Sequence, residues 1–111
     1  MALGELEQVV LLAIVRLDGE SHGAAIVEQI EDGTGKRVSP GALYTVLGRL
    51  ETKGFVQSWI GDSTPERGGR RRKVYKILPE GARALRDWYK GIRGMASGVL
   101  SRLEDLAEEA T

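Results

Sequence analysis

The sequence predicts a mainly α fold with one small β-hairpin. Two observations lead to this prediction. Apolar residues recur at helical spacing in the first half of the chain and again at its end, whereas residues 55–77 hold two strand-like runs around a glycine-rich loop. With 111 residues, 41% of them hydrophobic, the chain has the length and composition of one small globular unit. We expect this unit to span residues 1–78, with residues 79–111 added as a C-terminal dimerisation helix.

The first two helices are predicted from their apolar spacing and their end signals. Residues 5–17 are apolar around most of the helix circumference, so we expect this helix to be covered on more than one side. A second helix follows from about His22 to Gly33, with Ser21 as its N-cap. His22 is the only histidine, and Ser21-His22 lacks a third catalytic partner. We therefore interpret His22 as a helix-start residue and expect no metal or cofactor.

The third helix has a signal at each end and two different faces. Ser39 is suited to the N-cap, Pro40 to the first helical position, and Gly54 to the left-handed position after the last turn. One face carries only branched apolar residues: Leu43, Val46, Leu47 and Leu50. The opposite face carries small and polar residues with one long cation: Gly41, Ala42, Thr45, Gly48, Arg49 and Thr52. Such a face can come close to a grooved partner, although an ordinary solvated face has the same composition.

A β-hairpin with a basic tip follows this helix. Residues 55–60 are rich in β-branched and aromatic residues, and so are residues 74–77. Between them, residues 61–69 contain three glycines and a proline, which predicts a loop. Tyr75 and Ile77 are expected to face the core. Residues 39–77 hold eight basic and three acidic side chains, so the middle of a chain of zero net charge is net positive.

The last apolar stretch predicts a long helix that starts at Pro79 and runs for about 28 residues, or ~40 Å. A domain of this size cannot cover such a helix, so a second copy of the chain is its simplest partner. Gly91, Gly94 and Gly98 leave open whether the helix is continuous. The predicted dimerisation residues are Leu6, Val10, Leu85, Trp88, Tyr89, Ile92, Met95, Val99, Leu103 and Leu106.

Several functional classes are disfavoured by composition. The chain has no cysteine, which fits a cytoplasmic protein and leaves no disulfide or thiolate metal site. The most apolar run, residues 9–15, is far shorter than the ~20 residues of a membrane span, so we expect no membrane partner. The segment GTGK at residues 33–36 lacks the spacing of a phosphate-binding loop, and no clustered acid, base and nucleophile indicate an enzyme.

The order of three helices, a strand, a basic loop, a strand and a long helix is the winged helix-turn-helix pattern. The third helix of this pattern fits the major groove of B-DNA. The β-hairpin of residues 55–77 is the wing, and its basic loop can lie on the neighbouring DNA backbone. Double-stranded DNA is therefore the expected partner. The predicted contact residues are Ser39, Pro40, Gly41, Ala42, Tyr44, Thr45, Arg49 and Lys53 of the helix and Arg67, Arg70, Arg71, Arg72 and Lys73 of the wing. Tyr44 lies at the flank, where it can contact a phosphate or pack half-buried.

The sequence also resembles the PadR family of bacterial transcriptional regulators. The resemblance covers about residues 5–88 and is carried by His22-Gly23, by the run Ser39 to Gly54, and by the arginine-rich approach to Tyr75 followed by Glu80-Gly81. It implies a dimeric DNA-binding regulator, usually a repressor, of the subgroup with a single C-terminal helix. It implies operator contacts by Tyr44, Arg49 and the residues between Ser39 and Thr45.

The resemblance also implies a small aromatic effector at the dimer interface. Trp59, Trp88 and Met95 are candidates for such a site, with core or interface packing as the alternative. Gly48 departs from the family, which more often has a larger side chain there. We expect a pseudo-palindromic operator bound by a homodimer. The alternative function is a winged-helix module that contacts another protein and does not bind DNA.

Overall fold

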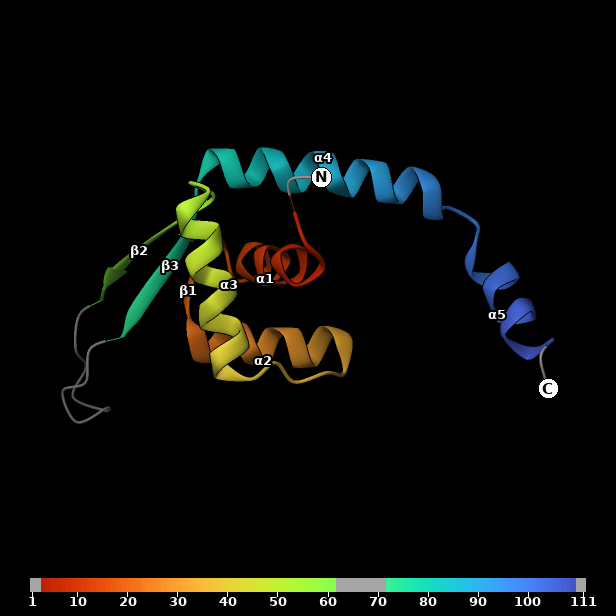
Figure 1. Ribbon diagram of the computed structural model, residues 1–111, viewed down its shortest axis with the longest axis horizontal. Coiled ribbons are helices and arrows are strands. Elements are labelled where there is room, and N and C mark those ends of the chain that lie inside the picture. The colour runs from red at the N-terminus through yellow and green to blue at the C-terminus, as the bar shows by residue number, and fades with distance from the viewer. Residues whose placement is uncertain (1–2, 62–71, 110–111) are drawn as a thin grey trace.

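The structure is a computed structural model that describes residues 3–61 and 72–109. Five helices and three strands occur in these residues (Figure 1). In chain order they are α1 (Glu5–Arg16), β1 (Glu20–His22), α2 (Gly23–Thr34), α3 (Pro40–Thr52), β2 (Val56–Ile60), β3 (Lys73–Ile77), α4 (Pro79–Ala96) and α5 (Leu100–Glu108). None of these helices is long and apolar enough to cross a membrane.

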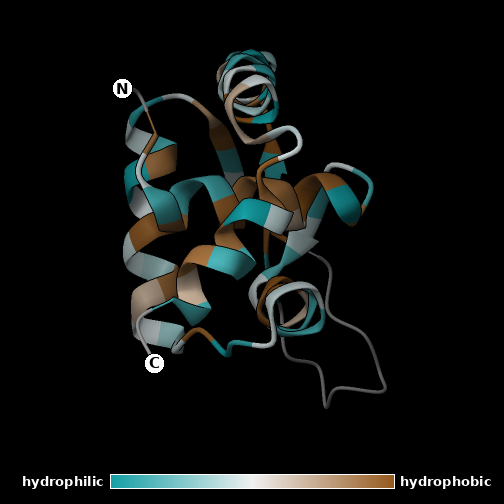
Figure 2. Ribbon diagram, turned by 90° about the vertical axis from the view of Figure 1, so that its right-hand side faces the viewer, coloured by the Kyte–Doolittle hydropathy of each residue, from teal (hydrophilic) through white to brown (hydrophobic). Residues whose placement is uncertain are grey.

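The core lies where α1, α2 and α3 meet against one face of the sheet and the first turns of α4. The four branched apolar residues of α3 are buried, as their spacing predicts. Tyr75 of β3 is buried among them and Ile77 packs against the same cluster, which confirms the predicted inward face of that strand. Hydrophobic ribbon is concentrated inside this unit in Figure 2. The residues with essentially no exposed surface are Val10, Leu11, Ile14, Ile26, Leu43, Leu47, Leu50 and Val56.

The sheet has three strands rather than the two of the predicted hairpin. Its order is β1-β3-β2, and both pairings are antiparallel. In the first of them Glu20 pairs with Lys76 and His22 with Val74. β1 has only three residues and no alternation that would predict a strand, so only its distant partner β3 defines it. This strand brings the start of α2 to the base of the wing.

The start of α2 corrects one prediction. Ser21 lies inside β1, and His22 is the N-cap, with its Nδ1 accepting a hydrogen bond from the N–H of Ala25 at 3.2 Å. His22 therefore has the predicted helix-start role, but the capping group is the imidazole and not the serine hydroxyl. α2 ends at Thr34, where Gly35 adopts φ +75°.

The C-terminal region is two helices and not the single helix of about 28 residues that the apolar stripe predicts. α4 ends at Ala96, Gly98 adopts φ +75°, and α5 begins at Leu100. α4 is anchored at its start, where a Cβ on Gly81 would lie 2.3 Å from the carbonyl oxygen of Phe55. Leu85 is buried in the core, whereas the helix beyond Trp88 projects away from the domain in Figure 1.

Candidate nucleic-acid interface

The exposed face of α3 is lined by small residues. Helical spacing places Gly41, Thr45, Gly48 and Thr52 along its middle, opposite the buried face, and all four are exposed. The hydroxyls of both threonines donate to carbonyl oxygens one turn earlier, Thr45 to Gly41 at 2.9 Å and Thr52 to Gly48 at 3.0 Å. Their protons are thus used within the helix, and their methyl groups and hydroxyl oxygens remain for an outside partner.

Two of these positions are glycines that the fold does not need. Nothing lies within 4 Å of a Cβ built on Gly41 or on Gly48, and neither residue has a positive φ. Glycine inside a helix costs about 1 kcal/mol relative to alanine. Two such glycines on one exposed helical face leave room for close approach by a partner outside the chain.

The start of α3 is held as predicted. The Oγ of Ser39 accepts a hydrogen bond from the N–H of Ala42 at 3.2 Å, and Pro40 occupies the first helical position. This cap fixes the direction in which the first turn points and leaves the exposed side of Gly41 clear. Because the other backbone N–H groups of a first turn have no intrahelical acceptor, this end of α3 favours an anionic group.

Tyr44 lies on one flank of the exposed face. Its position allows both roles considered for it, contact with a phosphate and half-buried packing. The residue is 51% exposed, and its ring also packs over the start of α2. A Cβ built on Gly23 would lie 2.8 Å from the tyrosine hydroxyl, so a larger residue at position 23 would displace the ring from this place. The His22-Gly23 pair therefore has a structural reason: one residue caps α2, and the other admits Tyr44.

A polar pocket of about 240 Å³ opens beside this hydroxyl, between α2, α3 and the base of the wing. It is lined by His22, Gly23, Ala24, Tyr44, Arg72 and Lys73. The guanidinium of Arg72 contacts Nε2 of His22, and the ammonium of Lys73 lies 5.8 Å from the centre of the Tyr75 ring. Two cations, a hydroxyl and the start of a helix thus surround one opening, a combination that suits an anionic group.

This pocket brings together predicted and unpredicted residues. Tyr44, Arg72 and Lys73 were expected to contact DNA, and the structure places them around one opening. His22 and Ala24 were not predicted there, because they reach the pocket only through the pairing of β1 with β3. The sequence contains no local signal for that pairing.

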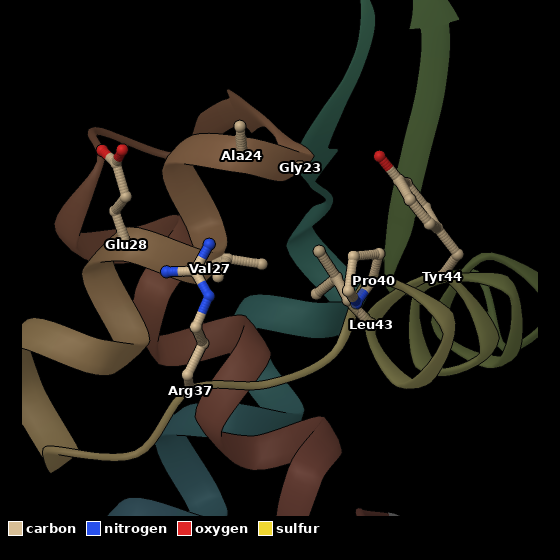
Figure 3. A pocket seen from close by; sticks show the side chains of 8 residues that line it. All are labelled: Gly23, Ala24, Val27, Glu28, Arg37, Pro40, Leu43 and Tyr44. Carbon is tan, nitrogen blue, oxygen red and sulfur yellow. The ribbon is translucent and has the colours of Figure 1, made fainter.

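A second pocket, of about 220 Å³, lies within the helix-turn-helix itself (Figure 3). Pro40, Leu43 and Tyr44 of α3 face α2 across it. Glu28 and Arg37 bring opposite charges to its rim. It is lined mainly by the residues that pack α3 against α2, so we interpret it as part of that packing.

Arg49 occupies the flank of α3 opposite Tyr44. It is exposed, and its guanidinium makes no hydrogen bond or ion pair within residues 3–61 and 72–109. A long cation whose guanidinium has no direct partner in the described residues can reach a phosphate or the acceptor atoms of a guanine. The exposed face of α3 is thus a smooth strip with a hydroxyl on one side and a guanidinium on the other.

Lys53, one of the predicted DNA contacts, also has a structural role within the fold. Its ammonium contacts both carboxylate oxygens of Glu7, at 2.7 and 2.9 Å, and the N–H of Gly4 donates to the same carboxylate at 2.7 Å. Burial disfavours the charged form of Glu7. The hydrogen bonds from Lys53 and Gly4, with the positive charges of Lys53 and Arg49, outweigh that effect and lower the pKa of the carboxyl. The pair ties the end of α3 to the start of α1.

The remaining predicted residues divide into three groups. Arg67, Arg70 and Arg71 lie outside the described residues. Val10 and Leu85 are buried in the core of the chain itself, so they offer no surface to a second copy, which corrects their assignment to the dimer contact. The other predicted dimerisation residues keep at least part of their surface exposed: Leu6, Trp88, Tyr89, Ile92, Met95, Val99, Leu103 and Leu106.

The three candidate effector residues do not form one site in the chain. Trp59 belongs to β2, whereas Trp88 and Met95 belong to α4. Figure 1 shows β2 and the end of α4 on opposite sides of the molecule. Trp88 packs against the core and Met95 is exposed.

Comparisons with known proteins agree with this fold. The model of the family described as "Transcriptional regulator PadR-like family" matches residues 11–87. The transcriptional regulator Rv3488 of Mycobacterium tuberculosis is 35% identical over 94 residues, which cover 85% of this chain and 83% of that protein.

Two solved structures with a similar fold are a transcriptional regulator and a DNA-binding protein. A PadR family transcriptional regulator from Eggerthella lenta superposes with a TM-score of 0.67 at 29% identity, covering 90% of this chain and 87% of that one. F93 from STIV, a winged-helix DNA-binding protein, superposes with a TM-score of 0.68 at 13% identity over 82% of this chain and 90% of its own. The winged-helix fold is thereby confirmed.

Proposed function

Because this chain belongs to the PadR-like family of transcriptional regulators, we propose that it binds a pseudo-palindromic operator as a homodimer and represses the genes beside it. The observation that carries the proposal is the exposed face of α3. A glycine-lined strip without structural cause, flanked by Tyr44 and by the exposed guanidinium of Arg49, has the shape and chemistry of a recognition helix. The major groove of B-DNA, ~12 Å wide, accepts such a helix.

Three kinds of contact follow from this placement. The strip from Gly41 to Thr52 lies against base edges, with the methyl groups of Thr45 and Thr52 suited to thymine. Arg49 reaches a guanine or a phosphate at one side of the groove. At the other side, the pocket beside Tyr44 receives a backbone phosphate between Arg72 and Lys73. The wing residues Arg67, Arg70 and Arg71 extend these backbone contacts.

The homodimer is supported by the apolar surface that α4 and α5 leave uncovered. Tyr89, Ile92 and Met95 of α4 are all exposed, which is unusual for residues on one stripe of an amphipathic helix. A two-fold pair would cover both copies of the stripe at once. We place a small aromatic effector at this dimer interface, near Trp88 and Met95, and exclude Trp59 because of its position on the wing. We assign the regulator to the cytoplasm.

A salt titration of DNA binding tests the proposal. Fluorescently labelled duplexes from the region upstream of the gene that encodes this chain are compared with a random duplex of equal length. We expect tight binding to one upstream duplex, with an affinity that falls steeply as salt rises because each neutralised phosphate releases counterions. Arg49→Ala should weaken specific binding about tenfold or more, in line with the ~1–3 kcal/mol of a good base contact.

Arg86→Ala is the matched control. Arg86 is exposed on α4 and pairs with the neighbouring Asp87, so its loss should leave DNA affinity unchanged. Equal weak binding to all duplexes, unaffected by Arg49→Ala, would contradict the proposal and favour the alternative winged-helix module that contacts a protein.

A further inference from the structure

Glu7 places a carboxylate inside the fold, and one lysine makes its ion pair. It is the one polar or charged residue that the described part of the chain buries. The ammonium of Lys53, at the end of α3, lies 2.9 Å from its Oε1 and 2.7 Å from its Oε2. The N–H of Gly4 donates to Oε1 at 2.7 Å. Because a carboxylate that has left water needs a cation beside it, this site has a strong demand for positive charge.

Arg49 is a second cation whose charge acts on the same carboxyl. Burial disfavours the charged form of Glu7, but the hydrogen bonds from Lys53 and Gly4, followed by the charges of Lys53 and Arg49, lower its pKa. The N–H of Lys53 donates to the carbonyl oxygen of Arg49 at 3.0 Å, so α3 is still helical between the two residues. Side chains four residues apart in a helix lie on the same side, which brings both cations toward Glu7.

The carboxylate of Glu7 and the operator have the same chemical use for Arg49. An arginine fork pairs with a carboxylate through two parallel hydrogen bonds, and it pairs with a phosphate or a guanine in the same way. The guanidinium can serve only one of these partners at a time. Arg49 lies one turn, about 5.4 Å, before Lys53 along α3, a separation that the long arginine side chain can span.

We propose that Lys53 keeps Arg49 available to the operator, because it occupies both carboxylate oxygens of Glu7 and thereby prevents Arg49 from pairing with them. This inference rests on the proposed function, in which Arg49 contacts DNA. Lys53 is then a positioning residue that acts through Arg49. Without the lysine charge, the carboxylate draws in the neighbouring guanidinium, and α3 enters the major groove without its long cation.

Removal of the lysine charge tests the inference in the full-length chain. Lys53→Met keeps much of the length of the side chain but not its charge. With the upstream duplex that the wild type binds, we expect Lys53→Met to weaken specific binding at least about fivefold, close to the loss caused by Arg49→Ala. Lys53→Arg is the matched control, since it keeps a cation beside Glu7, and its affinity should stay within about twofold of the wild type. Wild-type affinity in Lys53→Met would overturn the inference.

A double-mutant cycle separates an effect through Arg49 from every other effect. If Lys53 acts through Arg49, adding Arg49→Ala to Lys53→Met should weaken binding by less than about twofold more, whereas independent contacts would multiply their losses. Multiplied losses would mean that Lys53 itself contacts the DNA or acts by another route, and would overturn the inference.

Removal of the carboxylate is the opposite test. Glu7→Gln keeps an acceptor for the Gly4 N–H but has no charge that attracts Arg49. When Glu7→Gln is combined with Lys53→Met, specific binding should return to within about twofold of Glu7→Gln alone. Neither a direct DNA contact by Lys53 nor a purely structural ion pair predicts this recovery. A loss of affinity that persisted in the double variant would therefore contradict the inference.

Circular dichroism verifies that each variant is folded at the temperature of the titration. Lys53→Gln, whose amide can donate to the carboxylate without a charge, takes the place of Lys53→Met if that variant does not fold, and the same results are expected from it. Arg49→Ala in the otherwise wild-type chain distinguishes the two proposals. If it leaves specific binding unchanged, the operator contact and this inference both fail. If it weakens binding while Lys53→Met does not, the proposed function stands and only the inference is overturned.

Discussion

Gly48 is the residue at which stability and the proposed function conflict most directly. It sits in the middle of α3, fully open to solvent, and a Cβ there would meet nothing within 4 Å. We expect Gly48→Ala to raise the free energy of unfolding by about 1 kcal/mol, because alanine loses less conformational entropy in a helix. The same methyl group should weaken operator binding, because it separates the helix from the groove. Thermal denaturation and a DNA titration measure the two effects on one sample.

Gly94→Ala supplies the comparison for this prediction. Gly94 is also an exposed helical glycine with nothing near its Cβ position, but it lies on α4 opposite the apolar stripe. It should give a similar gain in stability with no loss of DNA affinity. If Gly48→Ala bound DNA as tightly as the wild type, α3 would not approach the duplex along this strip.

Glu7 makes the stability of the domain depend on pH. The residue is 7% exposed, and its carboxylate is held by Lys53 and the Gly4 N–H and has a lowered pKa. A carboxyl with a lower pKa in the folded state stabilises the fold above its unfolded pKa, and the stabilisation is lost as pH falls through the folded pKa. Glu7→Gln should therefore lower the free energy of unfolding at neutral pH by about 1–2 kcal/mol, a modest value because the Lys53 side chain is 39% exposed and water can solvate it.

Denaturant titrations of both proteins from pH 7 to pH 3 measure this effect. The difference between wild type and Glu7→Gln should be constant above about pH 5 and should shrink at lower pH, once the wild-type carboxyl binds a proton. A difference that stayed the same at every pH would mean that packing of the side chain, rather than its charge, is what the variant loses.

At the scale of the elements, local signals predicted the helices and non-local pairing explains most of what was missed. Ser39, Pro40 and Gly54 mark α3 within the sequence itself, so its position could be predicted closely. β1 exists only because β3, more than 50 residues later, pairs with it. For that reason the sequence indicated neither the third strand nor the part that His22 and Ala24 play beside Tyr44.

The break between α4 and α5 could not be located from the sequence, for a different reason. Gly91, Gly94 and Gly98 carry the same local signal for a break, but only Gly98 has a positive φ. Its neighbours in sequence do not distinguish it, because the apolar spacing continues from α4 into α5. Likewise the burial of Val10 and Leu85, and the capture of Lys53 by Glu7, depend on which helices pack together and not on the pattern within any one helix.

The cap of α2 provides a prediction at this scale. His22→Ala removes the acceptor for the Ala25 N–H and should cost about 1 kcal/mol of stability, equal to a fall of roughly 4 °C in Tm or more for a chain of this size. His22→Asn keeps a side-chain acceptor at the N-cap and should retain most of the wild-type Tm. Equal losses in both variants would show that the contact between the imidazole and Arg72, rather than the cap, is what stabilises this junction.

The whole molecule carries opposite charges in different regions although its net charge is zero. Residues 39–77, which include α3 and the wing, are net positive, and residues 1–38 hold seven acidic and three basic side chains. A polyanion is therefore attracted to the segment that contains α3 and the wing and repelled by the acidic first segment, which helps to orient the encounter with DNA. Because the positive region is small, sequence-independent binding should be weak and should disappear at moderate salt.

The homodimer predicts a fixed spacing between the two halves of the operator. Two recognition helices related by a two-fold axis enter major grooves on the same side of the duplex, about one helical turn apart. Inserting about 5 base pairs between the half-sites turns one of them to the opposite side, so affinity should fall to that of a single half-site. Inserting about 10 base pairs restores the side but lengthens the distance between the half-sites, so affinity should recover only if α4 and α5 allow the two domains to move apart. Electrophoretic mobility shifts on the three duplexes measure this. Equal affinity for all of them would show that each α3 binds its half-site independently and that the dimer does not set the register.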